Sequence, residues 1–132
     1  MRRVTDKEVG NQAFAKYNEI AKSAWDIVMA ASSLPDDVRV YILAHIAIDE
    51  FGHIKIKTIG KLLDEKIVIE GLVTIVFRTE IFNEQYFFRT KNTGMDTVKT
   101  PMMMFDDERI NNDLSAIDSV ICQYYNHQQQ VS

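Results

Sequence analysis

The spacing of the apolar residues changes near residue 66, and this change constrains the fold more than any other feature of the sequence. Before Lys66, apolar residues recur every three or four positions, which is typical of helices. After it, apolar and β-branched residues alternate with polar ones, which is typical of strands. The chain is therefore expected to be an α+β protein. A helical hairpin would span residues 1–65, and a mixed part of strands and helix would span 66–132.

A first helix is predicted from about Asp6 to Ala31, with the side-chain oxygen of Thr5 or Asp6 capping its free N–H groups. The polar face would carry Gln12, Glu19, Lys22 and Asp26. The apolar face would carry Phe14, Tyr17, Ala21, Ala24, Trp25 and Val28.

A second helix is predicted from Pro35, a residue favoured in a first turn, to about Leu63. Its apolar residues form a wide face, and further apolar residues lie beside that face. A helix that is apolar almost all round is buried on more than one side. The pattern thus predicts a homo-oligomer, a dimer or higher. The alternative is that a sheet covers the second side within one monomer. The face consists of Val38, Tyr41, Ile48, Phe51, Ile56, Ile59 and Leu62.

The second half predicts a small antiparallel β-meander. Strands are expected over 67–69, 73–81, 85–90 and 97–99, with a turn at 91–94. If 67–90 were a helix instead, the protein would be an all-α four-helix bundle.

A buried connector, Pro101 to Phe105, would lead to the last helix. Asp106 and Asp107 would cap that helix, because acidic residues favour helix N-termini. Its apolar residues at helical spacing are Ile110, Leu114, Ile117, Ile121 and Tyr124.

Length and charge bound the function. The 132 residues fit a single domain, and 15 basic against 19 acidic residues give a net charge of −4. This balance argues against general nucleic-acid binding, which needs a broad basic surface. Cys122 is the single cysteine, so no disulfide framework is expected. With no membrane-length apolar stretch and no signal-like start, a cytoplasmic location is expected.

One pattern points to metal. Glu50 and His53 form a Glu-x-x-His pair on the predicted second helix, and Glu19 lies on the first helix. This arrangement resembles half of a ferritin-like di-iron site, in which carboxylates and imidazoles complete the metal shell. The alternative is a solvated charged face, because the neighbours of these residues on the helix faces are also charged. Those neighbours are Lys22 and Asp26 for Glu19, and Arg39, Lys57 and Lys61 for Glu50.

A second pattern points to a nucleotide. Between residues 85 and 101 the only acidic residue is Asp96, and aromatic and basic residues are concentrated there. Rings stack on bases and cations hold phosphates. Arg109 follows among acidic neighbours, so it would either pair with them or reach a ligand. The predicted ligand-binding residues are Phe82, Phe88, Arg89, Lys91, Asn92 and Arg109.

On these residues the chain resembles the phage sponge proteins that counter Thoeris defence by capturing a cyclic ADP-ribose signal. The resemblance implies that Phe82 stacks on adenine, that Asn92 hydrogen-bonds it, and that Arg109 covers the base or holds phosphate. It also implies an oligomer held by paired helices and, for a phage protein, a location in the host cytoplasm. A second site for cyclic dinucleotides on those helices would use Lys22, Lys57 and Lys61.

The expected function is therefore a non-catalytic protein, without a cofactor, that sequesters a nucleotide-derived signal. A sponge needs affinity without turnover, and the sequence offers no catalytic motif. The alternative is a ferritin-like metal protein assembled across a dimer. A helical adaptor is a third hypothesis.

Overall fold

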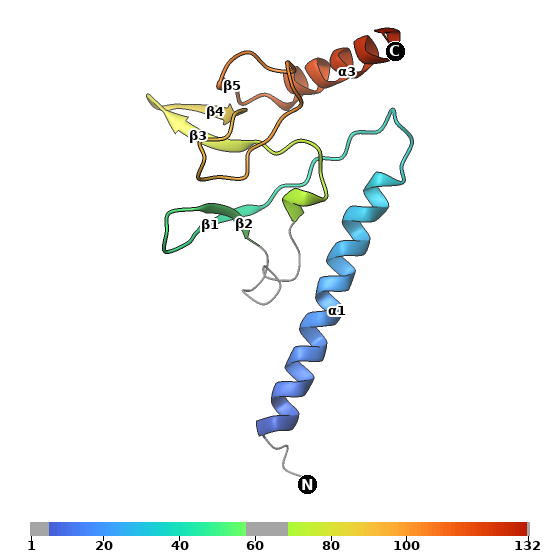
Figure 1. Cartoon of the computed structure of the whole chain (residues 1–132), viewed down its shortest axis with the longest axis vertical. Helices are drawn as coiled ribbons and strands as arrows, with labels where there is room; N and C mark the ends of the chain where they lie inside the picture. Colours follow the sequence, from blue (N-terminus) through green and yellow to red (C-terminus); the bar gives the residue numbers. More distant parts are fainter. Residues whose placement is uncertain (1–5, 58–68, 132) are drawn as a thin grey trace. The chain divides into compact units, whose positions relative to one another are not determined.

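A computed structural model describes residues 6–57 and 69–131 of the chain. The chain divides into two compact units, residues 1–47 with 56–72 and residues 48–55 with 73–132, and each is described by itself. The mixture of helices and antiparallel strands confirms the α+β class, and the all-α bundle alternative is wrong. That the chain is a single domain stays a prediction. The elements (Figure 1) are α1 (Asp6–Ser32), β1 (His45–Ile48), β2 (Ile54–Lys57), a short 3-10 helix (Ile69–Gly71), β3 (Arg78–Phe82), β4 (Gln85–Arg89), β5 (Arg109–Asn111) and α3 (Leu114–Val131).

Helix α1 has the bounds that the sequence predicts, within one residue. It ends where Ser32 Oγ donates to the carbonyl oxygen of Met29 at 2.6 Å, a local bond that competes with helix continuation. On its predicted apolar face Ala21 is buried against Leu72, whereas Trp25 stays 44% exposed. The apolar face therefore buries its small residues in this unit and leaves its largest one partly open.

The predicted second helix is wrong over the residues that the structure describes, and its residues 58–63 lie outside them. Residues 38–44 are irregular, and β1 and β2 form an antiparallel hairpin. Apolar residues are so dense here that they satisfy helical spacing and period two at once. Branching at Cβ favours the extended form. The β-branched residues at alternate positions are Val38, Val40, Ile42, Ile46 and Ile48.

The hairpin turn shows why a helix is not formed. Gly52 has φ 84°, a left-handed conformation that glycine adopts without steric cost. The Asp49 carboxylate accepts from the backbone N–H groups of Phe51 and His53, both at 2.9 Å. These bonds give the chain a turn at the middle of the predicted helix.

The second unit contains the sheet β3-β4-β5, in which both neighbouring pairs are antiparallel. Asn83 and Glu84 connect β3 to β4 with φ of 50° and 63°, as a two-residue hairpin turn requires. The predicted strand over 85–90 is confirmed as β4. Of 73–81 only the end is strand, and a single bridge joins Val76 to Lys99. The strand predicted over 67–69 is wrong at Ile69, which begins the 3-10 helix, and 67–68 lie outside the described residues.

One face of this sheet makes the core. Phe88 on β4 is 9% exposed and is buried with Ile117 and Ile121 of α3. Its register partner Ile110 packs against the same cluster. Met104 is buried there as well, which confirms the predicted connector at that residue, but Met102 and Met103 are 83% and 86% exposed. Sheet and helix α3 thus cover each other.

The last helix begins later than predicted. Asp113, rather than Asp106 or Asp107, caps it: its Oδ1 accepts from the N–H groups of Ser115 at 2.9 Å and Ala116 at 3.3 Å. Ile110, predicted to be helical, lies in β5. The stretch before Leu114 forms a strand because its backbone pairs with β4.

Candidate functional site

Three arginines form a row across the three-stranded sheet. The register pairs Arg78 of β3 with Arg89 of β4, and Arg89 with Arg109 of β5. Residues directly opposite one another on antiparallel strands project from the same face. Phe88 neighbours Arg89 in sequence and therefore projects from the other face, into the core. The three guanidinium groups thus share the sheet face that points away from the core.

A carboxylate lies among these arginines. Glu80 is two residues from Arg78 on β3 and therefore lies on the same face. Its Oε2 is 3.1 Å from Arg78 Nη2 and 3.7 Å from Arg89 Nη1, and its Oε1 accepts from Arg109 Nε. Glu80 is 17% exposed, so solvent screens these pairs less than at an open surface. We call Arg78, Arg89, Arg109 and Glu80 the arginine row.

The electrostatics of the row favour an ionised Glu80. The hydrogen bond from Arg109 lowers the pKa of the Glu80 carboxyl below its ordinary value. Burial raises it, but the charges of Arg109, Arg89 and Arg78 lower it further. The carboxylate therefore stays charged at neutral pH and pairs with all three arginines.

Two more carboxylates flank the row. Asp96 lies 3.8 Å from Arg78, and Glu108 lies 3.9 Å from Arg89. Among the described residues, these two and Glu80 equal the three arginines in number, so their charges balance. A further anion therefore binds most favourably where it replaces a carboxylate as the acceptor of guanidinium N–H groups.

Phe82 extends the row with an aromatic surface. The Arg109 guanidinium carbon lies 4.4 Å from the centre of the Phe82 ring, within cation-π distance. Phe82 is 47% exposed, which leaves ring surface open to another flat group. The structure thus brings together three of the predicted ligand-binding residues, Phe82, Arg89 and Arg109.

The structure places the other predicted residues apart from this face. Phe88 is buried in the core. Asn92 donates to the carbonyl oxygens of Asp96 at 2.9 Å and Val98 at 3.0 Å, and accepts from the Gly94 N–H at 2.6 Å. Both of its amide hydrogens are thereby used to shape the loop that begins at the predicted turn. The adenine contact expected of Asn92 would require these bonds to break.

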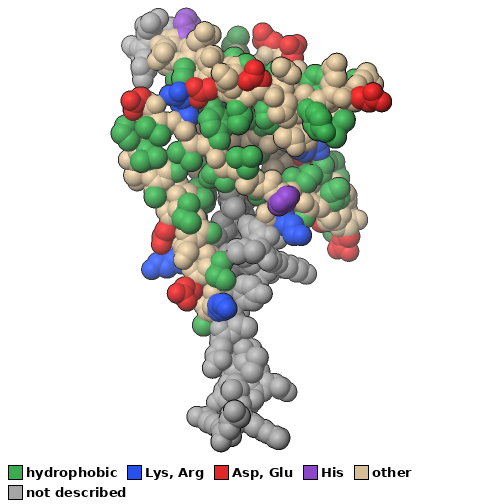
Figure 2. Space-filling view, turned by 180° about the vertical axis from the view of Figure 1, so that it is seen from behind, with side chains coloured by type: hydrophobic (Ala, Val, Ile, Leu, Met, Phe, Trp, Pro, Cys, Tyr) green, Lys and Arg blue, Asp and Glu red, His purple; other side chains and the backbone are tan. Residues whose placement is uncertain are grey.

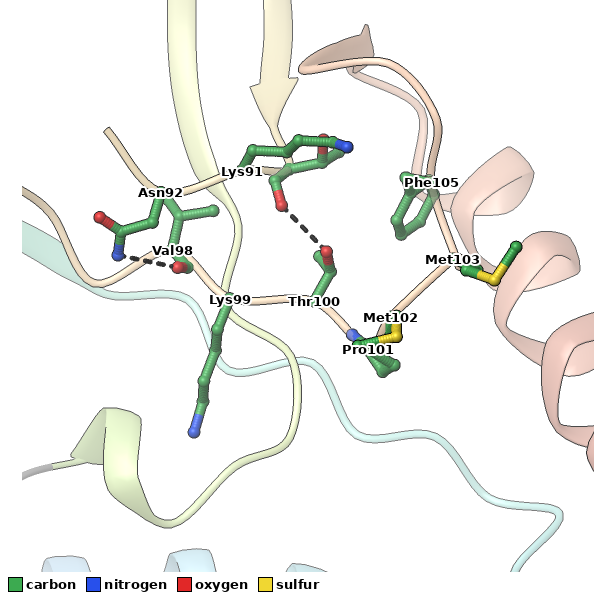
Figure 3. A pocket seen from close by; sticks show the side chains of 10 residues that line it. Lys91, Asn92, Val98, Lys99, Thr100, Pro101, Met102, Met103 and Phe105 are labelled. Atoms are coloured by element: carbon green, nitrogen blue, oxygen red, sulfur yellow. Dashed lines mark hydrogen bonds between the residues drawn. The ribbon is translucent and has the colours of Figure 1, made fainter. Parts of the chain in front are cut away.

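Lys91 and Asn92 line a groove of about 410 Å³ beside the end of β4 (Figure 3). Figure 3 shows the side chains of Lys91 and Lys99 extending in different directions, so their charges do not converge on one point. The groove therefore offers an anion fewer converging positive charges than the arginine row does. Its other lining residues are Thr90, Val98, Thr100, Pro101, Met102, Met103 and Phe105.

The residues of the metal hypothesis lose their helical geometry. Glu50 and His53 lie in the turn of the β1-β2 hairpin rather than one turn apart on a helix. His53 Nδ1 is 3.2 Å from Asp49 Oδ2, and Glu19 lies exposed on α1. Among residues 6–57 and 69–131, no group of three or more His, Cys, Asp or Glu side chains is arranged to hold a metal ion. The Glu-x-x-His helix on which the hypothesis depended is therefore wrong.

The predicted second site also loses its frame of paired helices. Lys22 is exposed on α1, Lys57 is exposed on β2, and Lys61 lies outside the described residues.

Arg78 and Glu80 are not among the predicted site residues. Both belong to the polar half of the alternating pattern over 73–81. With Phe82 they occupy alternate positions of one strand, and that spacing was the available signal.

No protein-family model, curated protein or solved structure matches the chain. Within the described parts of the chain, no helix has the length and apolar character that crossing a membrane requires.

Proposed function

We propose that the protein is a non-catalytic binder of a small phosphorylated nucleotide of the cyclic ADP-ribose type, and that it sequesters such a signal. The observation that carries this proposal is the arginine row with the Phe82 ring beside it. Arginine forks match phosphate oxygens, and an open ring stacks on a purine. One sheet face thus offers groups for both halves of such a molecule.

The proposed binding geometry follows from the order of the groups. Phe82 follows Arg78 and Glu80 along β3, and Arg109 stacks on its ring. Arg109 can therefore contact a base on Phe82 and a phosphate over the row at once. The base would stack at the Phe82 end, and the phosphates would lie over Arg89 and Arg78.

Calorimetry with cyclic ADP-ribose tests the proposal. Wild-type protein should bind it reversibly, and the ligand should be recovered intact after heat denaturation, because a sponge does not turn it over. Recovery of a cleaved product would indicate an enzyme instead. Absence of binding by cyclic ADP-ribose and by linear ADP-ribose would refute the proposal.

Phe82→Ala should weaken binding by roughly 5- to 150-fold, because stacking on an aromatic side chain contributes about 1–3 kcal/mol per base. Phe51→Ala is the matched control, since Phe51 is 71% exposed and lies in the hairpin turn. Arg109→Lys keeps the charge but loses the planar fork, so it should also weaken binding. Equal affinity for all three variants and wild type would place the ligand elsewhere.

We also propose that the chain forms a homo-oligomer. Over the described residues the helical surface that first suggested it is not formed, but apolar side chains remain exposed between residues 38 and 57, among them Ile42 (47%), Ile46 (49%) and Ile48 (67%). Figure 2 shows hydrophobic side chains at the surface in several places. Exposed apolar area is typical of association surfaces. Light scattering at micromolar concentration should show an oligomer that Ile46→Glu dissociates; a wild-type monomer would contradict this.

A further inference from the structure

Glu80 makes the contacts that an anionic ligand of the arginine row would make. Its two carboxylate oxygens are shared among Arg78, Arg89 and Arg109. A phosphate group would use the same guanidinium N–H donors, because carboxylate and phosphate both fit the arginine fork. Glu80 and a phosphate therefore compete for the same donors.

The position of Glu80 separates an exchange at the arginine row from the core. The residue projects from the face of β3 that points away from the core, where its side chain is 17% exposed, and the 47% exposed Phe82 follows along the same face. Phe88 and its contacts with α3 lie on the other face, so displacement of the Glu80 side chain toward the Phe82 end would not involve them. An exchange of this kind replaces one negative charge by the two or more of a pyrophosphate group, so the ion pairs that are lost are more than restored.

We propose that Glu80 is an internal stand-in for ligand phosphate: it occupies the arginine row in the free protein and is displaced when a pyrophosphate group binds. This inference rests on the proposed function and adds a selectivity rule to it. A ligand anion must outcompete a carboxylate that is already in place. Ligands with a single negative charge therefore bind poorly, and pyrophosphate-bearing ligands are selected.

The structural alternative makes a different prediction. If Glu80 only holds the sheet together, its loss leaves three like charges adjacent and disorders the row, which weakens anion binding. If Glu80 is a stand-in, removing its charge frees the donors, and anion binding becomes tighter.

Glu80→Gln separates these two roles, since glutamine keeps the shape and removes the charge. Calorimetry with inorganic pyrophosphate should show at least about a tenfold tighter dissociation constant for Glu80→Gln than for wild type. Glu84→Gln is the matched control: it removes the same charge four residues away, in the exposed turn, and should leave the affinity unchanged. Equal or weaker pyrophosphate binding by a Glu80→Gln variant with wild-type circular dichroism would overturn the stand-in.

Wild-type protein provides a second measurement that does not depend on how the variant folds. Carbon NMR of the Glu80 carboxyl, titrated with acid, reports its pKa, which the Arg109 hydrogen bond holds low in the free protein. With pyrophosphate at saturating concentration the pKa should rise, because Glu80 has left the arginines. A pKa that stays low at tens of millimolar pyrophosphate, about the range of a very weak site, would overturn the inference.

The two proposals can fail separately. Tighter pyrophosphate binding by Glu80→Gln, with no binding of cyclic or linear ADP-ribose to either protein, would support the stand-in and refute the proposed function. Binding of cyclic ADP-ribose that Glu80→Gln leaves unchanged or weakens would keep the function and refute the stand-in.

Discussion

The described residues contain two small antiparallel sheets that differ in what covers them. The β1-β2 hairpin has four exposed residues in β1 and only alternate half-buried residues in β2. The β3-β4-β5 sheet has one face buried against α3 through Phe88, Ile117 and Ile121. Two-stranded hairpins are marginal alone, whereas three strands with a covered apolar face are stable. Alternation in the sequence therefore makes a strand, but the covering element decides how much stability the strand contributes.

The largest expected effect is a difference between the two sheets in their response to truncation. Phe88→Ala should destabilise the second unit by about 3–5 kcal/mol, because it leaves a cavity in the core. His45→Ala, at an exposed position of β1, should change the free energy of unfolding by less than about 0.5 kcal/mol. Urea unfolding measured by circular dichroism checks both. Equal losses would contradict the comparison, because they would show that β1 is also packed.

A smaller effect is expected at the start of α3, the helix that covers the second sheet. Asp113→Ala should cost about 1 kcal/mol, the usual loss when a capping side chain is removed. Asp106→Ala is the control: the sequence alone favoured that position as the cap, but the structure leaves it exposed before β5. The same urea unfolding should show almost no change for it. A larger loss of stability for Asp106→Ala than for Asp113→Ala would indicate that the helix begins where the sequence predicted.

The third prediction concerns acid and the arginine row. The folded pKa of Glu80 lies below the ordinary value of 4.5, so folded protein binds fewer protons than unfolded protein in that range. Glu80 therefore contributes stability that is fully present above about pH 4.5, and this stability is lost as pH falls through the lowered pKa. The free energy of unfolding, measured from pH 6 to about 2, should fall more steeply with decreasing pH for wild type than for Glu80→Gln. Parallel curves would show that the row does not stabilise the sheet.

The smallest change in stability is expected at the β1-β2 turn. Asp49→Ala removes the acceptor for the N–H groups of Phe51 and His53, so the hairpin should open more often. Because little is buried there, global unfolding should not detect this. Hydrogen exchange should show faster exchange in 45–57 and unchanged rates in β4. Slower exchange in β4 than in β1 is also expected of wild type. Equal protection of the two sheets would remove the distinction between them.

The sequence predicted the elements with strong local signals. Helix α1 appears where helical spacing predicted it, and strand β4 appears where a run of aromatic residues follows the alternating segment. The segment 38–57 was missed because its apolar residues are dense enough to match two periods, and the turn at Gly52 decides between them. The α3 start was missed because Asp106 and Asp113 both suit a cap, and only pairing with β4 excludes the first.

The candidate site could be predicted only in part, for a different physical reason. Phe82 and Arg109 stand out locally by composition. The row depends on register, since Arg78 and Arg109 become neighbours of Arg89 only when three strands pair. No spacing within one segment encodes that alignment. Asn92 illustrates the opposite error. An asparagine amide can hydrogen-bond a nucleotide base, but here it donates to backbone carbonyl oxygens of its own loop.

The charge balance of the arginine row has a consequence for the rate at which a partner arrives. Opposite charges within about 4 Å of one another cancel beyond roughly one Debye length, about 8 Å in physiological salt. An approaching molecule therefore meets the net charge of −4 first and the guanidinium groups only on contact. Long polyanions are repelled over their whole length, whereas a small anion crosses the same distance at little cost. Such a surface captures its ligand without long-range electrostatic steering and selects it only at short range. Its association rate should therefore not increase at low ionic strength, as the association rate of a nucleic-acid binder does.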